Sequence, residues 1–495
     1  MNRLRLHTLA LVGALAVLPI LNGCAAAAVT APRKTLQAFA NEQEISALFE
    51  KWAEAHRRRM EAARRERQAQ SLADGPAEAQ APMAKAAPAP PAQGDASADA
   101  VTTVQHAGVD EGGIVKVHGD HLVVLRRGRL FTVSIADREL TPIATVNAYG
   151  PGIAPRGAWY DEMLISGNTI VVIGYSYARG GTEIGLFDIS RAGELRYKST
   201  YHLRSNDYYS SRNYASRLIG STLIFYTPLA LNPWNANPFA SFPAMRRWQP
   251  GVTAADFRRI APATRIYRTD DELDPFQGVA LHTVTTCDLA KAELECTSSA
   301  VMGPPGRVFY VSASSVYVWT TASRRIGAAS AAGAAVFRIP LDGAAPSALR
   351  TAGSPIDQFS FLDSGDGYLN VLLRGSGGGD GMWAAERSGG QLGLMRVALS
   401  SFSDGRDSAP RSAYRALPAP HGGALQNRYI GEHLVYGSGA GWRRPQAVRG
   451  GAAYAVRYAT AGAAQALSLP HGVDRIEALG RDAVLVGSDG RNLHF

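Results

Sequence analysis

A repeated unit in this 495-residue sequence constrains its fold more than any other feature. The unit is a short apolar run, a tight polar or glycine turn and a second apolar run, as in Ile114-Val-Lys-Val-His-Gly-Asp-His-Leu-Val-Val-Leu125. Seven copies occur, and a third apolar run follows in most of them. Four strands per unit, at a spacing of about 50 residues, are typical of the blades of a β-propeller. We therefore predict an all-β, seven-bladed propeller of four-stranded antiparallel blades over residues 101–495, with an insertion at 228–277.

The composition agrees with a folded chain that is rich in turns. Apolar residues make up 46% of the sequence, which is enough side chain to build a core, and 51 glycines provide for abundant turns. Three cysteines are too few for a disulfide-dense scaffold or for a zinc site with four thiolates.

The N-terminus has the pattern of a bacterial export signal. Arg3 and Arg5 precede an apolar run from Leu9 to Leu21, which is shorter than the roughly 20 residues that a membrane-spanning helix needs. The segment Leu21-Asn22-Gly23-Cys24 then resembles a lipobox, in which the chain is cut before a cysteine that carries diacylglycerol. We expect residues 1–23 to be removed and Cys24 to anchor the protein in a membrane, by default the outer membrane. The alternative is ordinary secretion with an unmodified cysteine.

A helix and a linker are predicted between the anchor and the propeller. Residues 24–70 form the stalk, and from Asn41 onward Ile45, Leu48, Phe49 and Trp52 fall on one face of a helix. The second half of this helix is basic, so it either faces water or contacts anionic lipid head groups. Alanine and proline account for 17 of the 30 residues in 71–100, and we interpret this segment as a disordered tether.

The remaining two cysteines are predicted to pair. Cys287 and Cys296 lie nine positions apart, on two expected strands joined by a turn. In an oxidising compartment outside the cytoplasm this arrangement favours a disulfide over two free buried thiols.

The segment Thr103-Val-Gln-His-Ala-Gly-Val-Asp-Glu-Gly-Gly-Ile-Val-Lys116 resembles the opening signature of a family of secreted bacterial and archaeal β-propeller proteins, distantly related to WD-repeat propellers. Gln105, Gly108, Val109, Asp110 and Lys116 are among the matching positions, whereas Gly113 stands where the family has an acidic residue. The resemblance implies the propeller and the helical segment before it, and no settled activity.

The innermost strand of each predicted blade begins with charged residues. In a propeller these positions surround one mouth of the central channel, where they would form ion pairs between blades or hold a polar ligand or a divalent cation. No other cofactor is predicted. The candidates are Asp110, Glu111, Asp161, Glu162, Arg217, Arg307, Asp357, Arg428, Asp474 and Arg475.

The insertion at 228–277 concentrates aromatic and arginine side chains, which are enriched at protein interfaces. It is a candidate recognition loop, and the alternative is that its aromatic residues pack over the propeller itself. Its candidate contact residues are Trp234, Phe239, Arg246, Arg247, Trp248 and Phe257.

These observations favour a non-catalytic binding or scaffold module at the bacterial cell envelope, with a protein or glycan as partner. The alternative is a periplasmic lyase, lactonase or hydrolase with its site in the axial funnel. The net charge of +9 is spread along the chain, so nucleic acid is not an expected partner.

Overall fold

The computed structural model describes residues 34–73, 105, 108–205, 215–232, 234, 237–271, 273–321, 333–377, 388–421, 423–439 and 451–495. The export signal, Cys24 and residues 74–104 lie outside these ranges, so the predictions made for them are not addressed. Within the described part of the chain, no helix is apolar over a length that could cross a bilayer.

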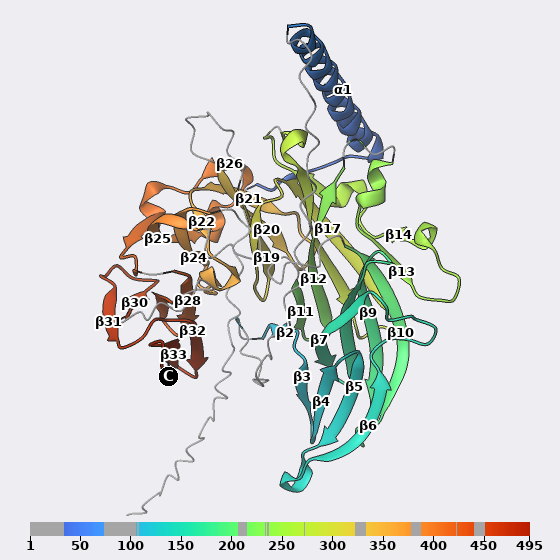
Figure 1. Cartoon of the computed structure of the whole chain (residues 1–495), viewed down its shortest axis with the longest axis vertical. Coiled ribbons are helices and arrows are strands. Elements are labelled where there is room, and N and C mark those ends of the chain that lie inside the picture. The colour runs from blue at the N-terminus through green and yellow to red at the C-terminus, as the bar shows by residue number, and fades with distance from the viewer. Residues whose placement is uncertain are drawn as a thin grey trace, which may run out of the picture.

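The described strands form seven mainly antiparallel sheets that follow one another in chain order (Figure 1). The first sheet is β3 (Val115–His118), β4 (His121–Arg126), β5 (Arg129–Ser134) and β6 (Thr141–Asn147). The second is β7 (Ala158–Ser166), β8 (Thr169–Ser176), β9 (Gly181–Ile189) and β10 (Leu195–Arg204), extended by β13 (Ala244–Arg247) and β14 (Arg258–Arg259). The third is β2 (Asp110–Glu111), β11 (Ala215–Ile219), β12 (Thr222–Leu231), β16 (Val279–Asp288), β17 (Glu295–Gly303), β15 (Ile266–Arg268) and β1 (Gln37–Ala38).

The remaining four sheets continue the series. The fourth is β18 (Arg307–Val311), β19 (Ser315–Thr321), β20 (Ala334–Pro340), β21 (Ser347–Thr351) and β26 (Asp404–Ser408). The fifth is β22 (Ser354–Pro355) and β23 (Phe361–Asp363), both on β24 (Tyr368–Ser376), then β25 (Gly389–Ala398) and β27 (Tyr414–Leu417). The sixth is β28 (Leu425–Ile430), β29 (His433–Ser438), β30 (Gly451–Arg457) and β31 (Gln465–Leu469), and the seventh is β32 (Arg475–Leu479), β33 (Asp482–Ser488) and β34 (Leu493–His494).

The predicted all-β propeller is therefore observed, with one α-helix before it. Six sheets have at least four strands and count as blades, whereas the described strands of the last sheet number three. The predicted count of seven blades is not confirmed.

Apolar side chains fill the spaces between neighbouring blades, because central strands such as β8 and β19 bury residues on both faces. One cluster joins Trp319 of the fourth blade to Phe361 of the fifth, and another joins Tyr226 of the third to Phe309 of the fourth. Burial on both faces explains why these two strands read as nearly continuous apolar runs rather than as alternating ones.

The insertion extends the second and third blades outward. Its strand β13 pairs with β10, and its strand β15 lies between β17 and β1, the strand that precedes the helix. The helix α1 (Glu42–Ala73) buries Ile45, Phe49 and Trp52 against Phe242 of the insertion and neighbouring residues of the third blade. At its start the amide of Glu44 donates to Asn41 Oδ1 over 3.0 Å, which caps the helix. The stalk and the insertion thus share one small core.

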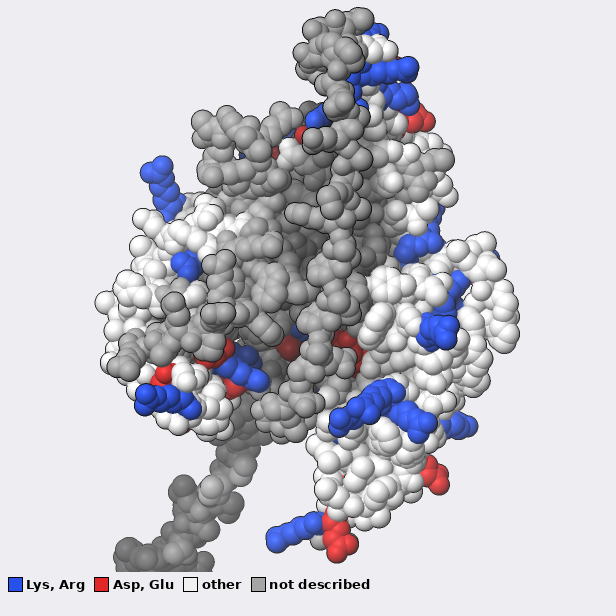
Figure 2. Space-filling view, in the orientation of Figure 1, with Lys and Arg blue, Asp and Glu red and all other residues white. Residues whose placement is uncertain are grey.

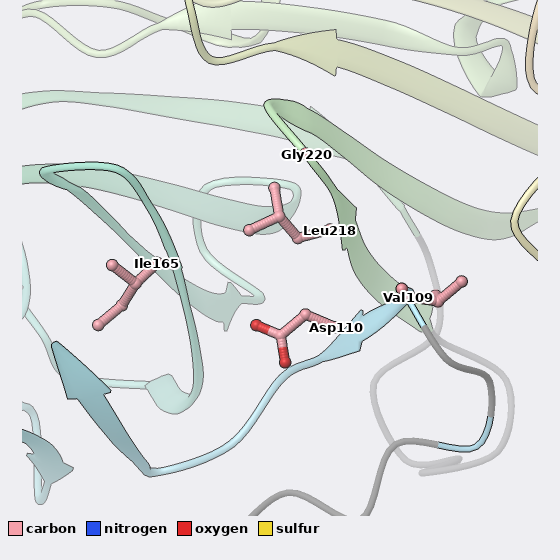
Figure 3. Close-up of a pocket in the computed structure, with 6 residues that line it drawn as sticks. Val109, Asp110, Ile165, Leu218 and Gly220 are labelled. Atoms are coloured by element: carbon pink, nitrogen blue, oxygen red, sulfur yellow. The ribbon is translucent and has the colours of Figure 1, made fainter. Parts of the chain in front are cut away.

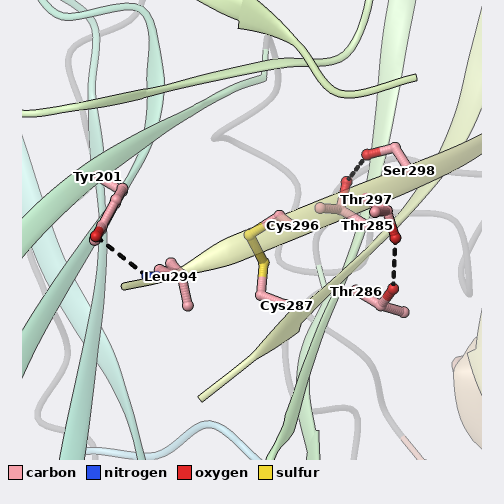
Figure 4. The surroundings of a disulfide bond; sticks show 8 residues. All are labelled: Tyr201, Thr285, Thr286, Cys287, Leu294, Cys296, Thr297 and Ser298. Atoms are coloured by element: carbon pink, nitrogen blue, oxygen red, sulfur yellow. Dashed lines mark hydrogen bonds between the residues drawn. A yellow bond between two sulfur atoms is a disulfide. The ribbon is translucent and has the colours of Figure 1, made fainter. Parts of the chain in front are cut away.

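The predicted disulfide between Cys287 and Cys296 is present (Figure 4). The two residues are register partners on β16 and β17, with Cα atoms 4.1 Å apart. Beside them Thr285 hydrogen-bonds Ser298 over 2.6 Å, and the Tyr201 hydroxyl accepts from the amide of Leu294 over 3.2 Å. The bond therefore fastens the outer hairpin of the third blade.

Replacing both cysteines by serine is expected to lower the free energy of unfolding by about 2–3 kcal/mol, since the nine-residue loop is freed in the unfolded chain. Urea denaturation of the wild type and of the Cys287→Ser/Cys296→Ser variant measures the difference. Adding a reductant should lower the stability of the wild type and leave the variant unchanged. Equal stabilities of the two proteins under oxidising conditions would contradict this expectation.

Candidate functional site

The described part of the signature segment, residues 105 and 108–116, contacts four blades. Asp110 and Glu111 pair as β2 with β11 of the third blade, and Gly113 forms an isolated bridge with Met163 of the second. The side-chain amide of Gln105 donates to the carbonyls of Gln358 and Phe361 in the fifth blade, and Val115 then opens the first blade. A segment that is continuous in sequence thus connects blades that are not neighbours.

The acidic residues of this segment are paired with basic residues around them. Lys116 Nζ lies 2.7 Å from Asp110 Oδ1 and also donates to the carbonyl of Glu111. Arg217 of β11 lies 3.6 Å from Glu111 and donates to Gln358 Oε1 over 3.1 Å. Both basic side chains are buried, so these interactions are less screened by solvent than surface pairs.

Glu162 of β7 stands beside this group with an altered pKa. Burial raises the pKa of its carboxyl to about 7, and the charges of Asp161 and Glu111 act in the same direction. The Ser216 hydroxyl, which donates to Glu162, and the Arg217 guanidinium act in the opposite direction without cancelling the burial. This carboxyl is therefore partly protonated near neutral pH.

A second group of charged residues comes from the fifth, sixth and seventh sheets. Asp357 accepts from the amide of Phe359 over 3.0 Å and from Asn427 Nδ2 over 3.2 Å. The Arg428 guanidinium lies over the Phe359 ring, 4.5 Å from its centroid, and 4.0 Å from the Glu477 carboxylate. Burial lowers the pKa of Arg428.

The structure brings most of the predicted axial residues together, which we name the axial cluster. Its members are Asp110, Glu111, Glu162, Arg217, Asp357, Arg428 and Arg475, joined by Lys116, Ser216, Gln358 and Glu477, which the sequence reasoning did not single out. Asp161 and Asp474 are exposed beside it, and the side chain of Arg307 lies outside the described part. Lys116 was within reach of sequence reasoning, because it closes the signature.

No group of three or more potential metal-binding side chains is found among the described residues. A metal cation at the axis stays a prediction. In the structure the Asp110 carboxylate is paired with the ammonium group of Lys116.

A cavity of about 250 Å³ opens beside the axial cluster (Figure 3). Val109, Ile165 and Leu218 give it apolar walls, and the Asp110 carboxylate points into it. Asp110 is therefore the group of the axial cluster with access to a small pocket.

The second blade holds a buried polar row that sequence reasoning missed. Tyr160, Gly174, Glu183, His202 and Arg246 are successive register partners across five strands. Tyr160 reaches over Gly174, where a side chain would collide with the carbonyl of Trp159 at 2.2 Å, and donates to Glu183 Oε1 over 2.7 Å. We name these five residues the polar row.

Glu183 is the centre of the polar row. Its second oxygen lies 3.0 Å from Arg179 Nε and 3.2 Å from His202 Nε2. Burial alone would raise the pKa of Glu183, but the bonds from His202 and Tyr160 and the charge of Arg179 outweigh it and hold the pKa below its ordinary value. The side chains of Glu183 and His202 are 1% and 0% exposed, so no solvent replaces these partners.

The candidate residues of the insertion pack mostly against the protein itself. Phe239 contacts Phe242 in the core beneath α1, and Trp234 stacks on His56 of the helix at 4.2 Å. Trp248 meets His202 edge to face at 5.9 Å.

Phe257 and the arginines of the insertion also contact other parts of the protein. Phe257 lies under the guanidinium groups of Arg204 and Arg246, and Arg246 is buried and donates to the carbonyl of Arg179. Arg247 is exposed and pairs with Glu293. Of the two alternatives, these contacts favour packing over the propeller, and a recognition role for the insertion stays a prediction.

An exposed aromatic pair lies close to the axial cluster. Trp159 of β7 is 39% exposed and Tyr177, just after β8, is 50% exposed, and their rings meet edge to face at 5.8 Å. Trp159 precedes Glu162 by three residues on an innermost strand. This pair presents apolar area to solvent at the end of the second blade where β7 begins and β8 ends.

Comparisons with known proteins are consistent with the observed architecture. A family model described as "Beta propeller domain" matches residues 100–406. No curated protein matches the chain.

Solved structures resemble the chain only weakly. They include the acylaminoacyl peptidase of Pyrococcus horikoshii, with 10% identity, coverage of 76% of this chain and 49% of that one, and a TM-score of 0.31. They also include the apocarotenoid oxygenase of Synechocystis, with 11% identity, coverage of 76% and 74% and a TM-score of 0.29. A putative 6-phosphogluconolactonase of Bacteroides fragilis has 13% identity, coverage of 63% and 86% and a TM-score of 0.23. The chain spans about half the length of the peptidase, and we draw nothing on activity from these likenesses.

Proposed function

Because the chain belongs to the Beta propeller domain family, we propose that it is an exported, lipid-anchored propeller that serves as a non-catalytic binding module at the bacterial cell envelope. Its partner is a protein or a glycan of that compartment, and neither a cofactor nor nucleic acid takes part. The three strands β32–β34 belong, in this proposal, to a seventh blade.

The pairing within the axial cluster carries the proposal. Asp110 pairs with Lys116, and Glu111 pairs with Arg217, which also donates to Gln358 of the fifth blade. Such bonds fix the positions of the blades and make the propeller a rigid frame. A rigid frame lowers the entropy cost of binding a partner at its surface.

We assign the contact with the partner to the Trp159–Tyr177 pair. Large aromatic side chains supply most of the energy at many interfaces, because they bury a large area at a small entropy cost. Both a protein surface and the apolar face of a sugar ring fit an exposed ring pair of this kind.

The binding role is tested by cross-linking and affinity purification from solubilised envelopes. A partner should be recovered with the wild type and lost by at least tenfold with Trp159→Ala/Tyr177→Ala. Leu140→Ala/Ile143→Ala, which removes exposed apolar side chains from another part of the surface, should leave recovery unchanged. If both variants recovered the partner equally, the Trp159–Tyr177 pair would not be the contact site.

Lipidation is tested at Cys24. Metabolic labelling with palmitate should mark the wild type and not Cys24→Ser, and the variant should move from the membrane fraction to the soluble fraction. Mass spectrometry that shows an unmodified mature N-terminus would contradict the anchor.

One observation favours the alternative of a periplasmic enzyme. A carboxyl with a pKa of about 7 is suited to proton transfer at neutral pH, and Glu162 has that value next to the axis. A screen of ester and lactone substrates would then show turnover by the wild type and a loss of at least 100-fold with Glu162→Gln. Turnover that survives this substitution would have to come from another site.

A further inference from the structure

The second half of α1 carries a dense basic charge away from the propeller. The helix has 32 residues, about 48 Å, and its buried contacts end with Trp52. Figure 1 shows its C-terminal half extending beyond the sheets, and Figure 2 shows basic side chains along it. Between positions 57 and 67 six arginines stand against two glutamates, and all eight are exposed: Arg57, Arg58, Arg59, Arg64, Arg65, Arg67, Glu61 and Glu66.

This half of the helix has little within the described chain to stabilise it. Its last contacts with the insertion are His56, stacked on Trp234, and Arg59, whose guanidinium lies 4.3 Å from the Phe276 ring centre. One i,i+4 ion pair, Arg58 with Glu54, supports it. A helix with polar side chains on every face is only marginally stable in water unless contacts with another surface stabilise it.

We propose that this basic half of α1 binds the anionic head groups of the membrane in which Cys24 is anchored. The proposal rests on the lipid anchor of the proposed function and names a second contact with the same membrane. Charge complementarity supports it, because a helix with four to eight lysines and arginines next to a lipid anchor is attracted to anionic head groups.

The length of the chain before the described part allows this contact. Gln37 follows Cys24 by thirteen residues, which span at most about 45 Å when fully extended. Gln37 pairs with Arg268, and the helix begins five residues later. The start of α1 therefore lies within reach of the bilayer surface.

A second copy of the chain fits the same surface less well. Within positions 57–68 the apolar side chains are Met60, Ala62 and Ala63, which do not form the regular seam that pairs helices in a coiled coil. Two such helices would also bring eight net positive charges together. An anionic lipid surface would neutralise the positive charge of the helix, whereas a second copy of the helix would double it.

Vesicle co-sedimentation of the full mature chain with Cys24→Ser tests the helix without the lipid. Vesicles of phosphatidylcholine and phosphatidylglycerol at 3:1 should sediment the protein, and vesicles of phosphatidylcholine alone should not. Adding Arg57→Gln, Arg58→Gln, Arg64→Gln, Arg65→Gln and Arg67→Gln should reduce the apparent partition by at least tenfold. Glutamine keeps a helix propensity close to that of arginine, so the helix itself is retained.

A matched control separates the helix from the charge of the whole protein. It carries five glutamines at exposed arginines of the first two blades, namely Arg126, Arg127, Arg129, Arg156 and Arg191. This control should bind as the parent does, and 0.5 M salt should weaken both. Equal losses in the two variants, or equal binding to both kinds of vesicle, would overturn the proposal. Failure of the anchor would appear separately, as an unmodified Cys24 in the native protein.

Discussion

Replacing Glu183 by alanine is expected to lower the free energy of unfolding by about 3–5 kcal/mol, because it leaves buried charged and polar partners without their acceptor. Arg179, His202 and Tyr160 all donate to this carboxylate. The polar row crosses five strands, so its loss should loosen the second blade together with strand β13 of the insertion. Urea denaturation followed by circular dichroism measures the change.

Glu194→Ala is the matched control for this prediction. Glu194 is an exposed glutamate on the same blade, and its loss should change the free energy of unfolding by about 0.5 kcal/mol or less. The polar row is not a stabilising unit if the two variants unfold at the same urea concentration.

The pH dependence of the same variant provides a second measurement. The pKa of Glu183 is lower in the folded protein than in the unfolded chain, so its contribution is present above about pH 4.3 and is lost as the pH falls through the folded value. The wild type should therefore lose more stability on acidification than Glu183→Ala does.

Replacing Glu162 by glutamine is expected to raise stability at pH 8 by about 1–3 kcal/mol. The pKa of this carboxyl is raised to about 7 in the folded protein, whereas the unfolded chain has an ordinary value of about 4.3. Between these values the folded state holds the proton more tightly, so stability is greatest below pH 4.3 and falls as the pH rises through 7. Glutamine stays neutral and still accepts a hydrogen bond from Ser216.

Thermal denaturation at pH 5 and pH 8 checks this prediction. The difference between the two pH values should be smaller in Glu162→Gln than in the wild type, with the larger gain at pH 8. Glu139→Gln, at an exposed position of the first blade, should follow the wild type at both values. A variant that loses stability at pH 8 would show that the charged form of Glu162 is favoured in the folded state.

Much of the architecture was predictable from the sequence, because it depends on local patterns. The third apolar run of the repeated unit forms, for example, β9, Gly181–Ile189, and β20, Ala334–Pro340. The hairpin turn at Gly119 has a positive φ of 56°, as a two-residue turn of this kind requires. The number of blades was not predictable in the same way, because it depends on how the last strands pair.

The candidate site was predictable only in part. Charged residues at the starts of the innermost strands indicated an axial cluster, and Arg217, Asp357 and Arg428 do lie there. Their partners were not predictable, because Gln358 and Arg217 are 141 positions apart and meet only through the packing of blades. The polar row escaped notice for the same reason, since its members are spread from Tyr160 to Arg246.

The sequence by itself determined the hairpins of the blades, the helix and the cross-strand pairing of Cys287 with Cys296, because neighbours along the chain set each of these. Tertiary structure alone decided which charges meet at the axis, how Glu183 gathers its donors and where the insertion packs. These interactions join residues on different strands or blades, so their energies depend on distances and burial that no local pattern contains. The basic half of α1 stays exposed beyond its last contacts with the insertion, which His56 and Arg59 make.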